Sequence, residues 1–160
     1  MSDAPHFRRA VRVLLLDQAD RVLLFRSERP DTGAPFWFPP GGGLEGDEDL
    51  HTAARRELYE ETGLTEVSFG PEIWRRRHAF TWRGVAYDQH ERWLMAHVPH
   101  FEPDGTAMDP NEQADLTAWH WWTVAELEAT PDELVPRDLA PRMRRLLAAG
   151  PPPSPLEIGT

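Results

Sequence analysis

Short apolar runs separated by turn-forming residues predict strands in the N-terminal part of the chain. Ala10–Leu16 is apolar and β-branched, and Arg21–Phe25 repeats this character after the turn Asp17–Asp20. The two runs are therefore expected to pair as a hairpin. Arg26–Pro35 is polar, contains two prolines and a glycine, and is expected to be a loop. Phe36–Phe38 is apolar again and predicts a third, short strand.

A repeat of three and four residues then replaces the short runs and predicts a helix. Gly63 lies where a helix is expected to end, because glycine readily adopts the left-handed conformation there. Asp47 is the expected N-cap, and the charges of Glu48 and Asp49 suit the first turn. The apolar side of this helix, which must face a core, consists of Leu50, Ala53, Ala54 and Leu58.

Large residues alternating with arginine and histidine predict the next strands. Ile73–Trp82 has this pattern, Gly84 provides a turn, and Tyr87–Val98 is the expected partner strand. Glu66–Phe69 and Leu116–Trp122 predict two further strands, the first of them short.

The remaining segments predict loops and one short helix. Residues 1–8 are expected to form a loose arm, and Pro99–Gln113, which is rich in acids and prolines, a long exposed loop. Thr123 is a good N-cap for a helix over Val124–Ala129, and Glu126 completes a capping box with it.

The order of elements predicts an α/β fold in which a mixed β-sheet lies between helices. A last helix is expected to begin at Pro136 or Asp138 and to end at Ala149. We therefore predict a single domain over residues 1–149, followed by a proline-rich, mobile tail over 150–160.

The composition of the 160-residue chain excludes several kinds of protein. There is no cysteine, which excludes disulfides, thiolate nucleophiles and cysteine-ligated metals. No apolar run approaches the ~18 residues of a membrane span, and the N-terminus lacks the apolar core of a signal peptide. We therefore expect a cytoplasmic protein with no membrane partner. The formal net charge of −10 argues against general nucleic-acid binding.

Three glutamates project from one side of the helix that ends at Gly63. Glu57 and Glu61 are four residues apart, Glu60 lies three residues after Glu57, and like charges at this spacing repel. A divalent cation offsets the repulsion, because Mg²⁺ prefers carboxylate oxygens and water. Arg56 can bridge to Glu48 or Glu60 and fix the carboxylates. The plain alternative is a solvated acidic helix surface.

These acids belong to a longer pattern that resembles the signature of the Nudix hydrolases. The signature is a glycine, five residues, glutamate, seven residues, Arg-Glu-Leu, one residue, Glu-Glu, one residue and Gly-Leu. All of its positions are filled, by Gly42, Glu48, Arg56, Glu57, Leu58, Glu60, Glu61, Gly63 and Leu64.

The resemblance implies an α/β/α sandwich that hydrolyses a diphosphate linkage in a nucleoside diphosphate joined to another group. It implies Mg²⁺ as cofactor, with Mn²⁺ as a substitute. Carried over residue by residue, Glu57 and Glu61 are direct metal ligands, and Glu60 ligates a metal or its water. The backbone carbonyl of Gly41 is a further expected ligand, and Arg56 orients the acids.

The resemblance leaves the general base open between a glutamate of the signature and a carboxylate from a later loop. Glu112 is the first candidate, with Asp109 and Asp115 as rivals and Glu60 as the alternative within the signature. A solvated loop acid is the other interpretation of Glu112.

Several arginines are candidates for binding substrate phosphates. Arg75 and Arg77 are expected to share one face of a strand and Arg76 the other, because side chains alternate. Arg26 and Arg29 lie in the predicted loop after the hairpin. The alternative for each is a solvent-exposed surface arginine.

Two further questions stay open at the level of sequence. The marks of particular Nudix subfamilies are mostly missing, so the nucleotide derivative is not assigned, and either a monomer or a homodimer is expected. The alternative function is a sensor module with a Nudix fold that binds a nucleotide without cleaving it.

Overall fold

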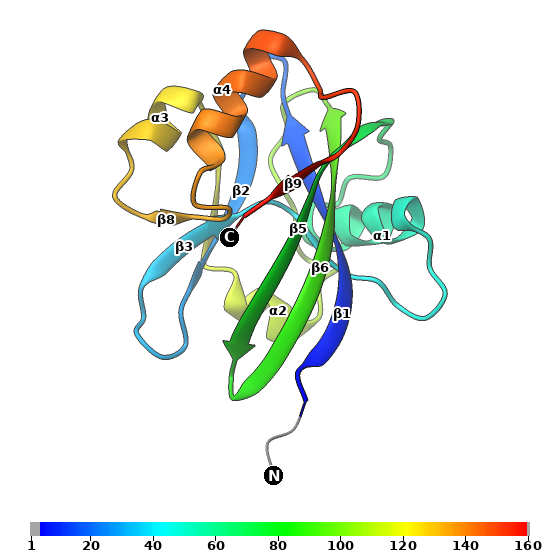
Figure 1. Ribbon diagram of the computed structural model, residues 1–160, viewed down its shortest axis with the longest axis vertical. Coiled ribbons are helices and arrows are strands. Elements are labelled where there is room, and N and C mark those ends of the chain that lie inside the picture. The colour runs from blue at the N-terminus through cyan, green and yellow to red at the C-terminus, as the bar shows by residue number, and fades with distance from the viewer. Residues whose placement is uncertain (1–3, 160) are drawn as a thin grey trace.

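A computed structural model describes residues 4–159 of the chain; residues 1–3 and 160 lie outside the description. Long strands run through the middle of the molecule, with helices on either side (Figure 1). The strands are β1 (His6–Leu16), β2 (Val22–Glu28), β3 (Pro35–Phe38), β4 (Gly41–Gly43), β5 (Phe69–Trp82), β6 (Val85–His97), β7 (Ala118–Trp122), β8 (Glu133–Leu134) and β9 (Leu156–Ile158). The helices are α1 (Leu50–Thr62), α2 (Pro110–Asp115), α3 (Val124–Ala129) and α4 (Leu139–Ala149).

The strands form one mixed sheet in the order β8-β3-β2-β1-β6-β5-β9, with β4 paired to β1 and β7 paired to β2. β1 runs parallel to β6 from His6 to Leu16, and β5 and β6 form a long antiparallel hairpin (Figure 1). The expected hairpin of β1 and β2 is present, with Leu16 opposite Val22.

Helix α1 covers one face of the sheet. Its apolar side chains pack against alternate residues of β1, because successive side chains of a strand point to opposite faces. This core contains, among others, Ala53, Ala54 and Leu58 of α1 with Val11, Val13 and Leu15 of β1.

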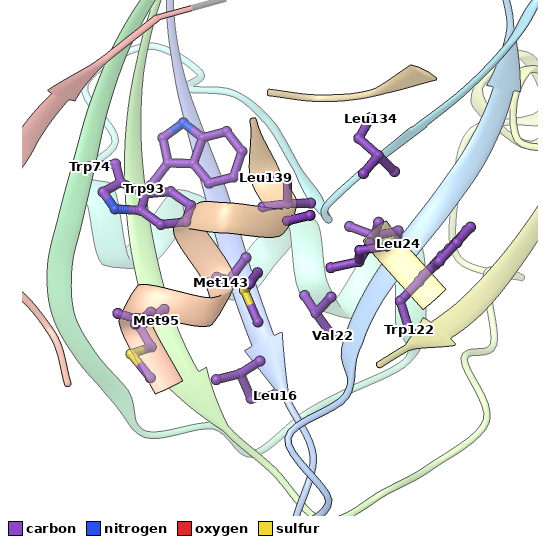
Figure 2. Packing of buried hydrophobic residues seen from close by; sticks show 14 of the residues in the cluster. Leu16, Val22, Leu24, Trp74, Trp93, Met95, Trp122, Leu134, Leu139 and Met143 are labelled. Carbon is purple, nitrogen blue, oxygen red and sulfur yellow. The ribbon is translucent and has the colours of Figure 1, made fainter. Parts of the chain in front are cut away.

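Helices α3 and α4 cover the opposite face. Figure 2 shows Leu139 and Met143 of α4 among strand side chains of this second core. Its members include Leu14, Leu16, Leu24, Trp93 and Trp122 from the strands. Helices on both faces of a mixed sheet confirm the predicted α/β/α sandwich.

The strongest local sequence signals are confirmed. Thr123 caps α3, and the predicted capping box with Glu126 is present in both directions. The last helix begins after Asp138 and ends at Ala149, as expected. In residues 4–159 no helix has both the length and the apolar character that crossing a membrane requires.

Other boundaries were predicted wrongly. The N-cap of α1 is Asp49, whose side chain accepts a hydrogen bond from the N–H of Thr52, and not Asp47. β1 begins at His6, so the last three residues of the arm expected over residues 1–8 belong to this strand. Residues 1–3 of the expected arm lie outside the description. β2 continues to Glu28, so the first residues of the predicted loop belong to this strand. The strand predicted over Glu66–Phe69 is absent, apart from Phe69, where β5 begins.

Two segments expected to be irregular contain regular structure. The predicted loop Pro99–Gln113 ends in α2, which places Glu112 on a short helix. In the proline-rich tail, β9 pairs in parallel with β5, and Ile158 is buried. The carbonyl of Gly159 also accepts a hydrogen bond from Nε of Arg76, at 3.2 Å. Mobility of the rest of the tail stays a prediction.

Candidate active site

Three consecutive glycines form β4 and lie against β1. Gly41 has a φ of +144°, and a Cβ there would collide with the backbone of Val11. A Cβ at Gly42 would lie 2.5 Å from Oε1 of Glu57. The missing side chain at Gly42 therefore allows the carboxylate of Glu57 to approach the backbone closely.

The predicted acidic side of α1 is present. Glu57 and Glu61 are buried, with exposed fractions of 6% and 5%, and the side chain of Glu60 is 29% exposed. Oε1 of Glu61 accepts a hydrogen bond from the backbone N–H of Gly41, at 3.1 Å. This contact joins β4 to α1 through the N–H of Gly41, so the metal-ligand role of its carbonyl stays a prediction.

Arg56 holds these acids in place. Its Nε and Nη2 donate to the two carboxylate oxygens of Glu48 at 2.8 and 2.9 Å, and its Nη1 donates to Glu57 at 3.0 Å and to Glu60 at 3.4 Å. Nη2 also donates to the carbonyl of Gly43, at 3.0 Å. The hydrogen bonds from Arg56 lower the pKa of Glu48 to about 2, so this pair stays charged.

The electrostatics of the buried acids suit a bound cation. Burial, followed by the charge of Glu57, raises the pKa of Glu61, and the same two causes raise the pKa of Glu60. Two buried carboxylates side by side are stable only when they share a proton or a cation. Carboxylate oxygens are the donors that Mg²⁺ prefers, so the residues fit this ion.

The acids are not arranged as a finished metal cage. Within residues 4–159, no three acid or histidine side chains converge closely enough to form one. Mg²⁺ usually keeps several waters and takes only one or two carboxylates from the protein, together with substrate phosphates. An incomplete set of protein ligands is therefore compatible with this ion.

Glu112 lies on the exposed surface of α2, near the acidic cluster. Partial loss of hydration, followed by the charges of Glu57 and Glu60, raises its pKa. Its two rivals are engaged elsewhere: Asp109 caps α2 through the N–H of Asn111, and Asp115 forms an ion pair with Arg83. Of the three acids, Glu112 therefore remains the first candidate, and its role as general base stays a prediction.

A pocket lies next to the acidic cluster, between β1, β3, β5 and β6. Arg8 and Arg12 belong to its lining, and Arg8 also lies against β4, because a Cβ at Gly43 would come within 2.6 Å of its Nε. Burial and the charge of Glu57 raise the pKa of Glu61, although the charge of Arg12 lowers it. The pocket therefore lies close to the glutamates.

Three of the arginines predicted to bind substrate lie outside this pocket. Arg75 pairs with Glu72, and Arg77 pairs with Asp88 on the same outer face of the sheet. Arg26 donates to Oγ1 of Thr117 at 2.8 Å, beside β7. Their substrate roles stay predictions, and this arrangement does not support them.

The two other candidate arginines line the pocket. Arg76 faces the opposite side from its neighbours, as predicted, and Arg29 lies in the same lining.

Sequence reasoning missed other residues of the pocket. Arg8 and Arg12 are four residues apart on a strand and share the face of Leu14, but the predicted strand began too late to show this. His78 lies in β5 and also lines the pocket.

Comparisons with known proteins agree with this architecture. A family model described as NUDIX domain matches residues 6–148. A protein of Caulobacter vibrioides (strain NA1000 / CB15N) named RNA pyrophosphohydrolase is 35% identical over 147 residues, which cover 84% of this chain and 80% of that protein.

Solved structures show the same fold at lower sequence identity. The crystal structure of a MutT protein from Methanosarcina mazei Go1 has a TM-score of 0.68 at 20% identity, covering 90% of this chain and 97% of that one. The NUDIX domain of Shewanella oneidensis NrtR, solved in complex with ADP ribose, has a TM-score of 0.62 at 20% identity and covers 91% and 90%.

Proposed function

The chain belongs to the Nudix family and is an enzyme that hydrolyses phosphoric anhydride bonds, and we propose that it cleaves a diphosphate linkage in a nucleotide derivative with the help of Mg²⁺. Mn²⁺ is the expected substitute. The observation that carries the proposal is the burial of Glu57 and Glu61 against the glycine strand β4, at 6% and 5% exposure. A pair of buried carboxylates is costly unless a cation is bound between them.

Each acid of α1 has a distinct part in this proposal. Glu57 and Glu61 hold the ion, and Glu60, which is more exposed, ligates it or orders its water. Bound Mg²⁺ neutralises phosphate oxygens and lowers the pKa of a coordinated water. Arg56 does not touch the substrate; it keeps Glu57 and Glu60 at fixed positions through the contacts described above.

Glu112 is the proposed general base. A base with a raised pKa accepts a proton from water more readily near neutral pH than an ordinary carboxylate does. The neighbouring negative charges raise the pKa of Glu112 in this direction. Its position on the short helix α2, outside the main sheet, allows it to approach when substrate binds.

The pocket between β1 and β5 is the proposed site of the nucleoside. Arg8 and Arg12 line this pocket and interact electrostatically with Glu57 and Glu61, so they would contact the phosphates. The relatives named RNA pyrophosphohydrolase make an RNA with a 5′-terminal triphosphate one substrate to test. A local pair of arginines suits such an end even in a chain with a net charge of −10. Cytoplasmic location and a monomeric or homodimeric state are further parts of the proposal.

The test is a substrate panel with Mg²⁺ or Mn²⁺. It contains nucleoside triphosphates, sugar nucleotides, ADP-ribose, dinucleoside polyphosphates and a short 5′-triphosphorylated RNA. We expect cleavage of at least one, and loss of about 10²-fold or more in kcat for Glu61→Gln. Glu128→Gln, the same substitution on the exposed surface of α3, is the matched control. Absence of cleavage for the whole panel contradicts the proposal.

The alternative function is a sensor that binds nucleotides without cleaving them. Tight binding by calorimetry, together with intact nucleotides after long incubation with metal, would favour it. The complete set of signature glutamates favours the enzyme.

A further inference from the structure

The pocket next to the acids contains buried polar groups that hydrolysis does not require. At its centre, Glu91 is 3% exposed and accepts hydrogen bonds from Nη1 of Arg76 at 3.0 Å and Nε1 of Trp93 at 3.1 Å. Nε of Arg12 lies 3.7 Å from its other oxygen. Burial raises the pKa of Glu91, but the charges of Arg12 and Arg76 lower it, and the pKa is lowered overall. The carboxylate is therefore charged and can only accept hydrogen bonds.

This carboxylate fixes the orientation of Gln89. Nε2 of Gln89 donates to Oε2 of Glu91 at 2.7 Å, in the interior of the protein. A charged carboxylate has no proton to donate, so the NH₂ of the amide must face Glu91 and the carbonyl oxygen must face away from it. Glu91 therefore determines which end of the Gln89 amide is directed away from the network.

The amide oxygen of Gln89 has no partner among residues 4–159, although Gln89 is only 2% exposed and lines the pocket. A second buried polar atom of the lining, Nδ1 of His78, is also unpaired within the described chain. Buried acceptors are normally satisfied, and an unsatisfied one in a pocket marks a place for a donor from a ligand.

The walls of the pocket suit a flat ring. On β5 and β6, His78 stacks on Phe80 with centroids 5.1 Å apart, and Phe80 stacks on Tyr87 at 5.2 Å. On β3, Phe36 and Phe38 form another stacked pair, at 5.4 Å. Aromatic faces bind nucleobases of any sequence through stacking, so selection among bases must come from polar groups.

We propose that this pocket binds a nucleobase and that Gln89 selects bases carrying an N–H donor, which its fixed amide oxygen accepts. This inference rests on the proposed function, since it assigns the base of the nucleotide whose phosphates lie near Arg8 and Arg12. A base edge that presents only acceptors leaves Gln89 unpaired and repels its oxygen, and such a mismatch discriminates strongly between ligands.

The first experiment measures binding to the wild-type protein by calorimetry, using nucleoside monophosphates, which contain no diphosphate linkage to cleave. Purine riboside monophosphate has no N–H on its base, whereas AMP, IMP and GMP each carry one or more. CMP and 2-pyrimidinone riboside monophosphate form the corresponding pyrimidine pair. We expect at least one donor-bearing base to bind roughly tenfold more tightly than its donor-free reference.

The second experiment repeats the series with Gln89→Met, which keeps the length of the side chain and removes the acceptor. We expect the preference for donor-bearing bases to disappear, while binding of the donor-free references changes little. Gln18→Met is the matched control, because Gln18 lies in the turn between β1 and β2. If Gln89→Met fails to fold, Gln89→Asn tests the same point, since it keeps an amide but withdraws it by one methylene.

The outcomes separate this inference from the proposed function. Equal binding of donor-bearing and donor-free bases by the wild type, or an unchanged preference in the Gln89 variants, overturns the role of Gln89 even if the substrate panel is hydrolysed. Conversely, a preference that Gln89→Met abolishes supports the base pocket even if no panel substrate is cleaved.

Discussion

Arg56 and Glu48 form a two-pronged ion pair, with Nε 2.8 Å from one carboxylate oxygen and Nη2 2.9 Å from the other. This geometry leaves Nη1 directed toward Glu57 and Glu60. A planar guanidinium can serve all three acids at once because its donors diverge in one plane, and an ammonium group cannot.

Arg56→Lys is therefore expected to lower kcat even though the charge is kept. We expect a loss of roughly 10–100-fold in Mn²⁺ affinity or kcat, since the acids would no longer be held by several bonds. Titration of Mn²⁺ and steady-state kinetics measure the two effects. Arg144→Lys is the matched control, because Arg144 makes a similar two-pronged pair with Glu128 on the exposed surface. Equal effects of both substitutions would contradict this role of Arg56.

Gly42→Ala tests the close approach of Glu57 to β4. The added Cβ would lie 2.5 Å from the carboxylate, so Glu57 must move away. We expect the affinity for Mn²⁺ to fall by about tenfold or more, as for other changes that displace a metal ligand. Gly159→Ala is the control, because a Cβ at Gly159 meets nothing within 4 Å. Normal metal affinity in Gly42→Ala would show that Glu57 is not a ligand at its observed position.

Glu112→Gln and Glu60→Gln distinguish the general base from a metal ligand. If Glu112 takes the proton from water, its substitution lowers kcat by roughly 10²–10⁴ and leaves Mn²⁺ affinity nearly unchanged. Glu60→Gln should instead weaken metal binding together with the rate. The readouts are kcat and Mn²⁺ affinity for both variants. Near-normal kcat in Glu112→Gln would move the role of base to Glu60.

The raised pKa of Glu61 predicts a pH dependence of stability without metal. A carboxyl whose pKa is raised from 4.5 by folding binds protons more tightly in the folded protein than in the unfolded chain. Its contribution therefore destabilises the fold above the raised pKa, and this destabilisation is lost as the pH falls toward 4.5. Glu61→Gln removes the buried charge and should raise the Tm of the metal-free protein at pH 8.

Thermal melts of both proteins at several pH values, with and without Mg²⁺, measure this effect. The difference in Tm between Glu61→Gln and wild type should shrink as the pH falls from 8 to 5, and titrating groups that do not interact with Glu61 cancel in it. Added Mg²⁺ should raise the Tm of the wild type at pH 8 and leave the variant unchanged. A difference that grows on acidification would show that Glu61 is not destabilised by its charge.

Elements defined by contacts within a few residues could be predicted from the sequence. The residues of the capping box, Thr123 and Glu126, are three positions apart, and Gly63 is the C-cap of α1 in the left-handed conformation. The cluster of Glu57, Glu60 and Glu61 follows from helical spacing, since side chains three and four residues apart share a face. These features depend little on the rest of the fold.

Features that depend on distant pairing could not be predicted. The glycines of β4 are required because β1 and Glu57 approach them closely, and both partners are remote in sequence. Arg8 reaches the site only because β1 extends alongside β6 to His6. Arg76 and its neighbours could be assigned to opposite faces from alternation, but which face borders the pocket depends on where the helices pack.

The parallel pairing of β9 with β5 has a consequence for the order in which the protein is made. A ribosome synthesises residues 69–82 long before residues 156–158, so during translation β5 has β6 as a neighbour but its other edge is open. An uncovered edge offers unpaired N–H and C=O groups to other chains. This edge of the nascent chain is therefore open to wrong strand pairing in the interval before β9 emerges. Arg76 acquires its carbonyl partner at Gly159 only at the end of that interval.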